Sequence, residues 1–112
     1  MKVREMTERF GLKISSGTRG LDREVRGGCC GDLLSDVMAN APPGCVWLTV
    51  QGHPNVVAVA VLREMAAIVV CGGRQADEET VLKADREAIP VLSWSGSVYA
   101  LAGRLFAAGV AG

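Results

Sequence analysis

The sequence predicts a single α/β domain, spanning residues 1–112, with a mostly parallel sheet of about five strands and helices packed on its faces. The main observation is the order of elements after residue 45, where short apolar runs alternate with helical segments. Such alternation favours parallel strands joined by right-handed crossovers. Composition agrees, because 49% of the residues are hydrophobic, only 4% are aromatic and 14 are glycine. That mixture is typical of an aliphatic α/β core, and the length suits one domain.

The first elements are short. Val3–Phe10 carries apolar residues at helical spacing and is followed by Gly11, so it predicts a helix that ends there. Residues 12–15 alternate as a brief strand, and residues 16–20 form a polar turn. Residues 24–30 are a second, weaker strand candidate.

The middle of the chain predicts a helix, a strand and a second helix. Asp32 is placed to cap a helix over residues 33–39. The continuous apolar run Cys45–Val50 predicts a strand that is covered on both faces. A helix from about Asn55 to Met65 follows, with Pro54 in its first turn. It is expected to bury Val56, Val57, Ala60 and Val61.

The remaining elements continue the alternation. Ala67–Cys71 is a second buried strand, and Pro90–Ser93 is a third. Between them, Asp77–Glu87 predicts a helix whose acidic first turn suits the helix dipole. Its inward residues are expected to be Val81, Leu82 and Ala84. Ser97–Ala108 predicts the last helix.

The loops at the carboxyl ends of the parallel strands form the candidate binding site. They supply glycines for close backbone approach, helix N-termini and one arginine, which suit a small phosphate- or carboxylate-bearing ligand. The candidate ligand-binding residues are Gly52, His53, Gly72, Gly73, Arg74, Ser93 and Ser95. The same loops also fit ordinary tight turns with no ligand, so both interpretations stay open.

No catalytic motif accompanies these loops. His53 is the only histidine and follows a strand, where a general base could lie, but a structural role is the favoured interpretation. No Gly-x-Ser-x-Gly nucleophile elbow is present. The Gly-x-x-x-x-Gly-Lys-Ser/Thr and Gly-x-Gly-x-x-Gly phosphate-binding motifs are also missing. We therefore expect a non-catalytic protein without a cofactor.

Charge and cysteine usage limit the partners and the compartment. Twelve Lys and Arg balance twelve Asp and Glu, which leaves no net field for a nucleic acid or an anionic membrane. Without a secretory signal or a long apolar run, a cytoplasmic location is expected. The four cysteines, Cys29, Cys30, Cys45 and Cys71, are then expected to be reduced thiols. Their spacing does not favour zinc, and Cys29 and Cys30 are expected to be the most oxidisable.

Several residue runs together resemble the DRTGG domain. They are Lys2–Glu5, Gly31–Ser35 followed by Val37 and Met38, Ala66–Gly73, Asp77–Glu79, Ala88–Ser93 and Tyr99–Leu105. The resemblance covers nearly the whole chain, and Gly72 and Gly73 match the family's Gly-Gly pair. Two departures stand out: Cys71 occupies the threonine position of Thr-Gly-Gly, and residues 52–54 replace an Asp-Arg pair.

The resemblance implies a three-layer α/β/α sandwich with a mixed sheet, similar to the amino-terminal domain of HPr kinase/phosphorylase. Such domains are often dimeric appendages beside phosphotransacetylase, CBS pairs or kinase-like anti-sigma factors. Stand-alone members resemble proteins of anaerobic bacteria that accompany iron hydrogenase and serine-kinase-like proteins. The resemblance therefore implies a homodimeric regulatory module in anaerobic metabolism that senses a small phosphorylated or nucleotide ligand.

A second hypothesis is a protein-interaction subunit without a small-molecule site. Its partner would be a kinase-like or hydrogenase-associated protein. The contact surface would be an apolar face of the last helix that includes Leu101, Leu105 and Phe106.

Overall fold

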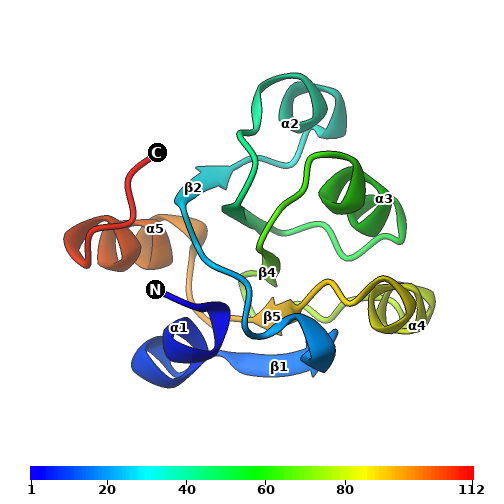
Figure 1. The fold of residues 1–112 in the computed structure, drawn as a ribbon, viewed down its shortest axis with the longest axis horizontal. Helices are drawn as coiled ribbons and strands as arrows, with labels where there is room; N and C mark the ends of the chain where they lie inside the picture. Colours follow the sequence, from blue (N-terminus) through cyan, green and yellow to red (C-terminus); the bar gives the residue numbers. More distant parts are fainter.

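The computed structural model describes all of residues 1–112 and contains five α-helices and five strands (Figure 1). The helices are α1 (Val3–Phe10), α2 (Leu34–Asn40), α3 (Asn55–Leu62), α4 (Glu78–Glu87) and α5 (Val98–Ala107). The strands are β1 (Lys13–Ser16), β2 (Gly27–Cys30), β3 (Cys45–Thr49), β4 (Ala67–Val70) and β5 (Val91–Ser93). They form one sheet in the order β1-β5-β4-β3-β2, in which only the β1–β5 pair is antiparallel. The predicted mixed, mostly parallel sheet is confirmed.

The helices divide between the two faces of this sheet. From β2 to β5 each new strand lies beside the previous one, so the right-handed crossovers place α2, α3 and α4 on the same face. Helices α1 and α5 cover the other face (Figure 1). The result is the expected three-layer sandwich. None of the five helices has the length and apolar character that crossing a membrane requires.

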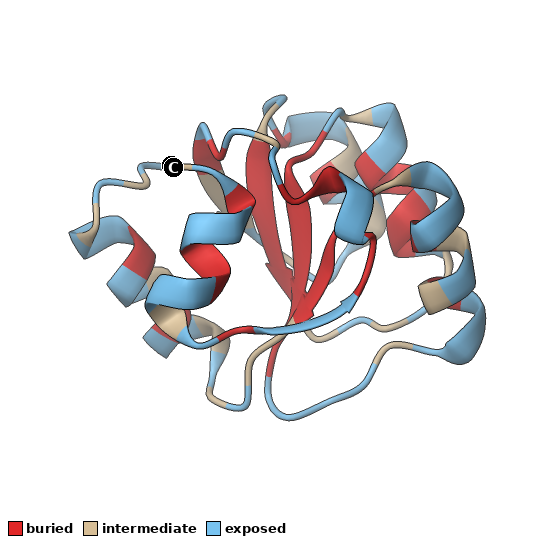
Figure 2. Ribbon diagram, turned by 60° about the horizontal axis from the view of Figure 1, so that its bottom comes forward, coloured by how far each residue is buried: buried red, intermediate tan, exposed pale blue.

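Two apolar clusters fill the spaces between the layers. One joins α1 and α5 to residues such as Val46, Leu48 and Val69 of the sheet. The other joins α2, α3 and α4 to residues such as Trp47 and Ile68. Every residue of β3 and β4 is buried, as their continuous apolar sequences predict, and Figure 2 shows these central strands in red between helices with exposed outer surfaces.

The predicted capping role of Asp32 is wrong. Leu33 occupies the N-cap of α2, and no side chain caps that helix. The Asp32 carboxylate instead accepts hydrogen bonds from Thr49 Oγ1 at 2.7 Å and from the Val50 amide at 2.9 Å. Because β2 and β3 are parallel neighbours, their carboxyl ends lie together, and the carboxylate ties one strand end to the other.

Several predicted core positions differ in the structure. In α3, Val59 is buried whereas Val61 is 42% exposed. In α4, Leu82 is 55% exposed, and the buried positions are Thr80 and Ala84. Thr80 is buried because its hydroxyl donates to the Gly52 carbonyl at 2.6 Å.

The helix boundaries also need correction at one place. α3 ends at Leu62 rather than at Met65. Glu64 has a left-handed backbone conformation, with φ of 53°, which an α-helix cannot continue through. The chain turns there and enters β4.

The predicted contact face of the last helix is wrong. Leu101 and Leu105 are buried against the sheet, and only Phe106 is exposed, at 70%. Leu101 and Leu105 therefore belong to the core, and of the three predicted residues only Phe106 is accessible to a partner.

Candidate functional site

Four of the seven sequence-predicted site residues lie around one cavity. Gly73, Arg74, Ser93 and Ser95 line a hollow of about 390 Å³ at the carboxyl ends of β4 and β5. Gln75, Ala76 and Val81, on the approach to α4 and within it, line it as well, together with Trp94 and the β1 residues Lys13, Ile14 and Ser15. The volume falls within the usual range of small-molecule sites.

The fold explains why these residues meet. β4 and β5 are parallel, so the loops that follow them leave the same edge of the sheet. The amides of Gly72 and Gly73 donate to the carbonyls of Gly96 and Trp94, at 2.8 and 3.2 Å. These two bonds hold the loop after β4 against the loop after β5.

The two glycines are needed for their backbone conformation. Their φ angles are 79° and 71°, in the left-handed region, and a side-chain carbon at Gly72 would meet nothing within 4 Å. Gly72 does not line the cavity. A bulky side chain at Gly72 would therefore strain the turn rather than fill a binding site.

The cavity is lined by positive charge only. Its two ionisable lining residues are Lys13 and Arg74, and neither makes an ion pair or a side-chain hydrogen bond within the protein. Lys13 comes from the opposite end of the chain, and it reaches the site because it pairs with Ser93 in the β1–β5 register. The hydroxyls of Ser15, Ser93 and Ser95 have no partner within the protein either. Two cations beside free hydroxyls suit a phosphate or carboxylate group.

Trp94 adds an aromatic surface to the same cavity. Its indole Nε1 donates to the Ser97 carbonyl at 3.0 Å, which fixes the ring at the start of α5. The Arg104 guanidinium lies 5.3 Å from the ring centroid, within the range of a cation–π contact. The ring is half-buried, and it is held in place before any ligand arrives.

The other predicted residues lie outside the cavity and have structural contacts. The Gly52 carbonyl accepts hydrogen bonds from the Asp77 amide and from Thr80, so it joins the loop after β3 to α4. His53 is exposed, and its Nδ1 accepts a hydrogen bond from the Asn55 amide at 3.1 Å, at the start of α3. No hydroxyl or thiol lies within hydrogen-bond distance of the imidazole.

Lys13, Ser15 and Trp94 are site residues that sequence reasoning missed. Trp94 lies between the predicted residues Ser93 and Ser95 in the sequence, so its place in the same loop could have identified it. Lys13 and Ser15 gave no such signal, because their strand reaches the site only through antiparallel pairing with β5, which is distant in sequence.

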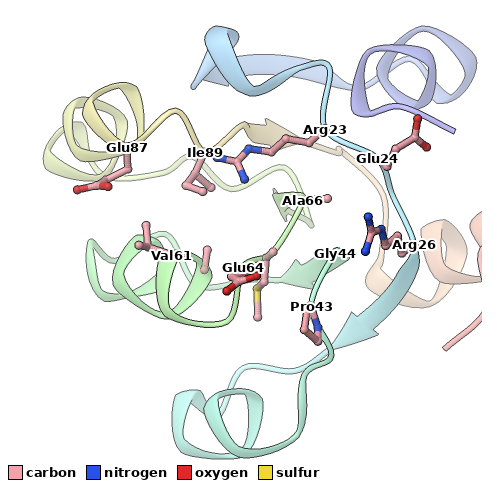
Figure 3. A pocket seen from close by; sticks show the side chains of 12 residues that line it. Arg23, Glu24, Arg26, Pro43, Gly44, Val61, Glu64, Ala66, Glu87 and Ile89 are labelled. Carbon is pink, nitrogen blue, oxygen red and sulfur yellow. The ribbon is translucent and has the colours of Figure 1, made fainter.

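A second hollow, of about 430 Å³, lies at the amino ends of the parallel strands (Figure 3). It has charges of both signs, with Arg23 and Arg26 on the segment before β2 and Glu64 and Glu87 at the ends of α3 and α4. Arg23 donates to the Ala88 carbonyl at 3.2 Å, which stabilises the negative C-terminal end of α4. Helix capping accounts for this arginine, so the carboxyl-end cavity is the stronger candidate for an anionic ligand.

Comparison with known proteins gives a fold but no family. No family model matches the sequence, and no curated protein matches it either. Among solved structures, the fold is similar to the crystal structure of the CBS and DRTGG domains of the regulatory region of Clostridium perfringens pyrophosphatase, complexed with the activator diadenosine tetraphosphate. The TM-score is 0.71 with 13% sequence identity, over 93% of this chain and 45% of that one. The chain thus spans less than half of that crystallised chain, and at this identity the likeness establishes a shared α/β fold.

Proposed function

We propose that this chain is a non-catalytic regulatory domain that binds a nucleotide, or another small phosphorylated ligand, in the cavity lined by Lys13, Arg74 and Trp94. The observation that carries the proposal is the pair of cations without internal partners at the carboxyl ends of the strands. The similar regulatory region of the pyrophosphatase was crystallised with a nucleotide activator, which supports the same ligand class.

The chemistry of the cavity favours a nucleotide over a simple anion. Lys13 and Arg74 can neutralise phosphate oxygens, and the planar guanidinium can donate two parallel hydrogen bonds. The half-buried Trp94 offers apolar surface for a base. A ligand with a charged end and a planar end uses both features at once.

The same lining supports a binding role rather than catalysis. The 11 residues around the cavity include no Asp, Glu, His or Cys. The site therefore lacks the imidazole, carboxylate and thiol groups that most often serve as general acid or base. A ligand bound there would be held and released unchanged, as in a sensor.

Thermal unfolding with a ligand panel tests this function. The panel contains adenine and guanine nucleotides, diadenosine tetraphosphate, cyclic dinucleotides, acetyl phosphate and nicotinamide cofactors. A ligand at a concentration 100 times its Kd stabilises the folded state by about 2.7 kcal/mol, which should raise the midpoint by roughly 10 °C. A saturable rise with one class supports the proposal, whereas no rise across the panel contradicts it.

Tryptophan fluorescence localises the ligand. The chain has two tryptophans, of which Trp94 lines the cavity and Trp47 is fully buried in the core. Binding should change the Trp94 emission, and the change should vanish in Trp94→Phe, which retains Trp47. A ligand response that survives in this variant would place the site elsewhere.

Charge reversal tests the two cations directly. Lys13→Glu and Arg74→Glu should each weaken binding by about tenfold or more, because each replaces an attractive contact to phosphate with a repulsive one. The matched control is Arg9→Glu on α1, which makes the same charge change at an exposed position outside the cavity. If all three variants weakened ligand binding equally, the effect would come from the net charge of the protein and not from contacts in the cavity.

A second candidate function is a protein-interaction subunit, and one observation favours it. The helix α3 is apolar around its whole circumference, yet part of it is exposed. Val57, Ala58, Val61 and Leu62 line a hollow of about 360 Å³ against α4, and Leu62 is 66% exposed. Helices that are apolar all round are normally covered.

We propose that the homodimer forms through the exposed apolar face of α3 and not through α5. Light scattering of the purified chain should give twice the chain mass, and Leu62→Glu should give the monomer mass. The matched control is Leu82→Glu on α4, an exposed leucine that does not line the hollow. A monomeric native chain would contradict the homodimer. A cytoplasmic location and a kinase-like or hydrogenase-associated partner stay predictions.

A further inference from the structure

Two of the four cysteines lie side by side between neighbouring strands. The Sγ atoms of Cys29 in β2 and Cys45 in β3 are 3.2 Å apart. In the parallel register Cys29 pairs with Trp47 and Cys45 pairs with Gly27, so the two cysteines are diagonal neighbours. Both pack with the cluster under α2 and α3. A disulfide needs its sulfur atoms about 2 Å apart, so a movement of roughly 1 Å would bring them to bonding distance.

From this geometry we propose that Cys29 and Cys45 are a thiol pair that hydroperoxides oxidise to a disulfide between β2 and β3. The inference does not depend on the ligand site, which lies at the β4, β5 and β1 side of the sheet.

The immediate surroundings of the pair support this chemistry. Cys45 is buried and Cys29 is half-buried, so only Cys29 is open to a small oxidant. The hydrogen bond from the Cys29 thiol lowers the pKa of Cys45, although burial opposes this change. The same hydrogen bond, with burial, raises the pKa of Cys29. The raised pKa of Cys29 slows its attack on the peroxide, but Cys29 is the partner that the oxidant can reach. Cys45, whose pKa is lowered, is the better nucleophile for the second step, in which the disulfide closes.

The other two cysteines have no such partner and serve as internal controls. Cys30 is exposed, and no other sulfur is within contact distance of it. Cys71 is buried, and its thiol lies 3.7 Å from the Val69 carbonyl oxygen. Burial raises the pKa of Cys71 to about 11, so this thiol stays protonated at neutral pH.

The proposed reaction balances in two steps. The Cys29 sulfur attacks one oxygen of hydrogen peroxide and breaks the O–O bond. The oxygen that leaves takes up the thiol proton and becomes water, so Cys29 becomes a sulfenic acid. The Cys45 sulfur then attacks the Cys29 sulfur and displaces hydroxide, which takes up the Cys45 proton as the second water. Two S–H bonds are oxidised to one S–S bond, and the peroxide is reduced by two electrons.

Mass spectrometry of the folded chain tests the proposal. After treatment with hydrogen peroxide and quenching, the number of free thiols in denaturant should fall from the four of the sequence to two, with a mass loss of two hydrogens. Dithiothreitol should restore both values. Cleavage after Arg26 and Arg63 leaves Cys29, Cys30 and Cys45 in one peptide. A second cleavage at Asp32 separates Cys45 from the other two and shows whether a bond joins the two fragments, and the substitutions below distinguish Cys29 from Cys30.

Single substitutions distinguish the pair from other thiols. Cys30→Ser and Cys71→Ser should still form the bond, whereas Cys29→Ser and Cys45→Ser should not. The chain oxidised in strong denaturant is the reference for geometry, because there Cys45 can join any of the other three cysteines. The proposal is overturned if the folded chain keeps four free thiols, forms only sulfenic or sulfinic acid at Cys30, or shows the unselective pattern of the denatured chain.

Stability gives a second readout. The disulfide would join two cysteines that are 16 positions apart in the sequence, which should raise the unfolding midpoint by on the order of 10 °C if the bond fits the native strands. The rise should disappear with dithiothreitol and be absent in Cys45→Ser. A lower midpoint after oxidation would show that the bond distorts the sheet and would overturn the inferred fit.

Discussion

Replacing Gly17 by alanine is expected to destabilise the fold strongly, because this residue lies where the turn after β1 packs against the segment before β5. The Gly17 φ angle is 74°, in the left-handed region. Its amide donates to Asp85 Oδ1 at 2.7 Å. A side-chain carbon there would lie 1.9 Å from the Ile89 carbonyl oxygen.

The cost can be worked from these contacts. The left-handed conformation costs a non-glycine residue about 1 kcal/mol or slightly more. The clash with Ile89 involves backbone atoms, so no rotamer change relieves it and the turn must move away. That movement breaks the hydrogen bond to the Asp85 carboxylate, which contributes about 1.5 to 3 kcal/mol. We expect a loss of about 3 to 4 kcal/mol, a large part of the 5 to 15 kcal/mol by which domains are typically stable.

Urea and thermal unfolding of the purified variants measure this loss. Gly17→Ala should lower the midpoint by on the order of 15 °C. Gly11→Ala is the matched control, because Gly11 has a φ angle of 66° but nothing within 4 Å of the added carbon. That variant should lose only about 1 kcal/mol. Equal losses of stability in the two variants would refute the reasoning, because the clash with Ile89 and the hydrogen bond to Asp85 would then contribute nothing measurable.

Three other predictions concern single contacts. Asp32→Ala should lower the free energy of unfolding, measured in urea, by about 2 to 3 kcal/mol, because Thr49 Oγ1 and the Val50 amide lose their acceptor. Asp32→Asn keeps an acceptor oxygen and should retain much of the stability. Ser97→Ala should cost about 1 kcal/mol, since Ser97 Oγ accepts from the Ala100 amide at the N-cap of α5; an unchanged midpoint would contradict this. Burial raises the pKa of Cys71 from 9.0 to about 11, so the unfolded chain ionises first as the pH rises. Between about pH 9 and pH 11 the free energy of unfolding should therefore fall by ~2–3 kcal/mol more in the native chain than in Cys71→Ala, which keeps only the decline due to the other cysteines.

Most of the fold was predictable because its signals are local. The apolar runs that became β3 and β4, and the glycine after α1, each depend on a few neighbouring residues. The antiparallel pairing of β1 with β5 was not predictable from periodicity, since it joins segments almost 80 residues apart. The resemblance implied a mixed sheet, but it did not identify which strands are antiparallel.

One of the two errors in the core has a clear physical cause. Val61 and Leu82 were expected to be inward because apolar residues at helical spacing usually face the core. On α4 the buried position went to Thr80 instead, because the Gly52 carbonyl gives its hydroxyl an acceptor. A polar residue with a buried partner can therefore displace a leucine from the inward face, and its partner is invisible in the sequence.

The candidate site was predicted only in part, because some of its residues meet through contacts that the sequence does not reveal. Gly73, Arg74, Ser93 and Ser95 follow two parallel strands, and the rule that such loops share an edge brought them together correctly. His53 and Gly52 follow β3 by the same rule, but their contacts turn them towards α3 and α4. Lys13 required knowledge of the tertiary pairing.

The division of the helices between the two faces has a consequence for folding. The cluster beneath α2, α3 and α4 is made entirely of residues between Val37 and Val91, so a contiguous segment of the chain can assemble it. The opposite cluster combines Val3 and Met6 with Leu101 and Leu105, so it cannot close until α5 has been synthesised. During synthesis the face of β3 and β4 that carries Val46, Leu48 and Val69 therefore stays uncovered longest. A nascent chain that stalls before α5 would expose this apolar face to chaperones and to other chains.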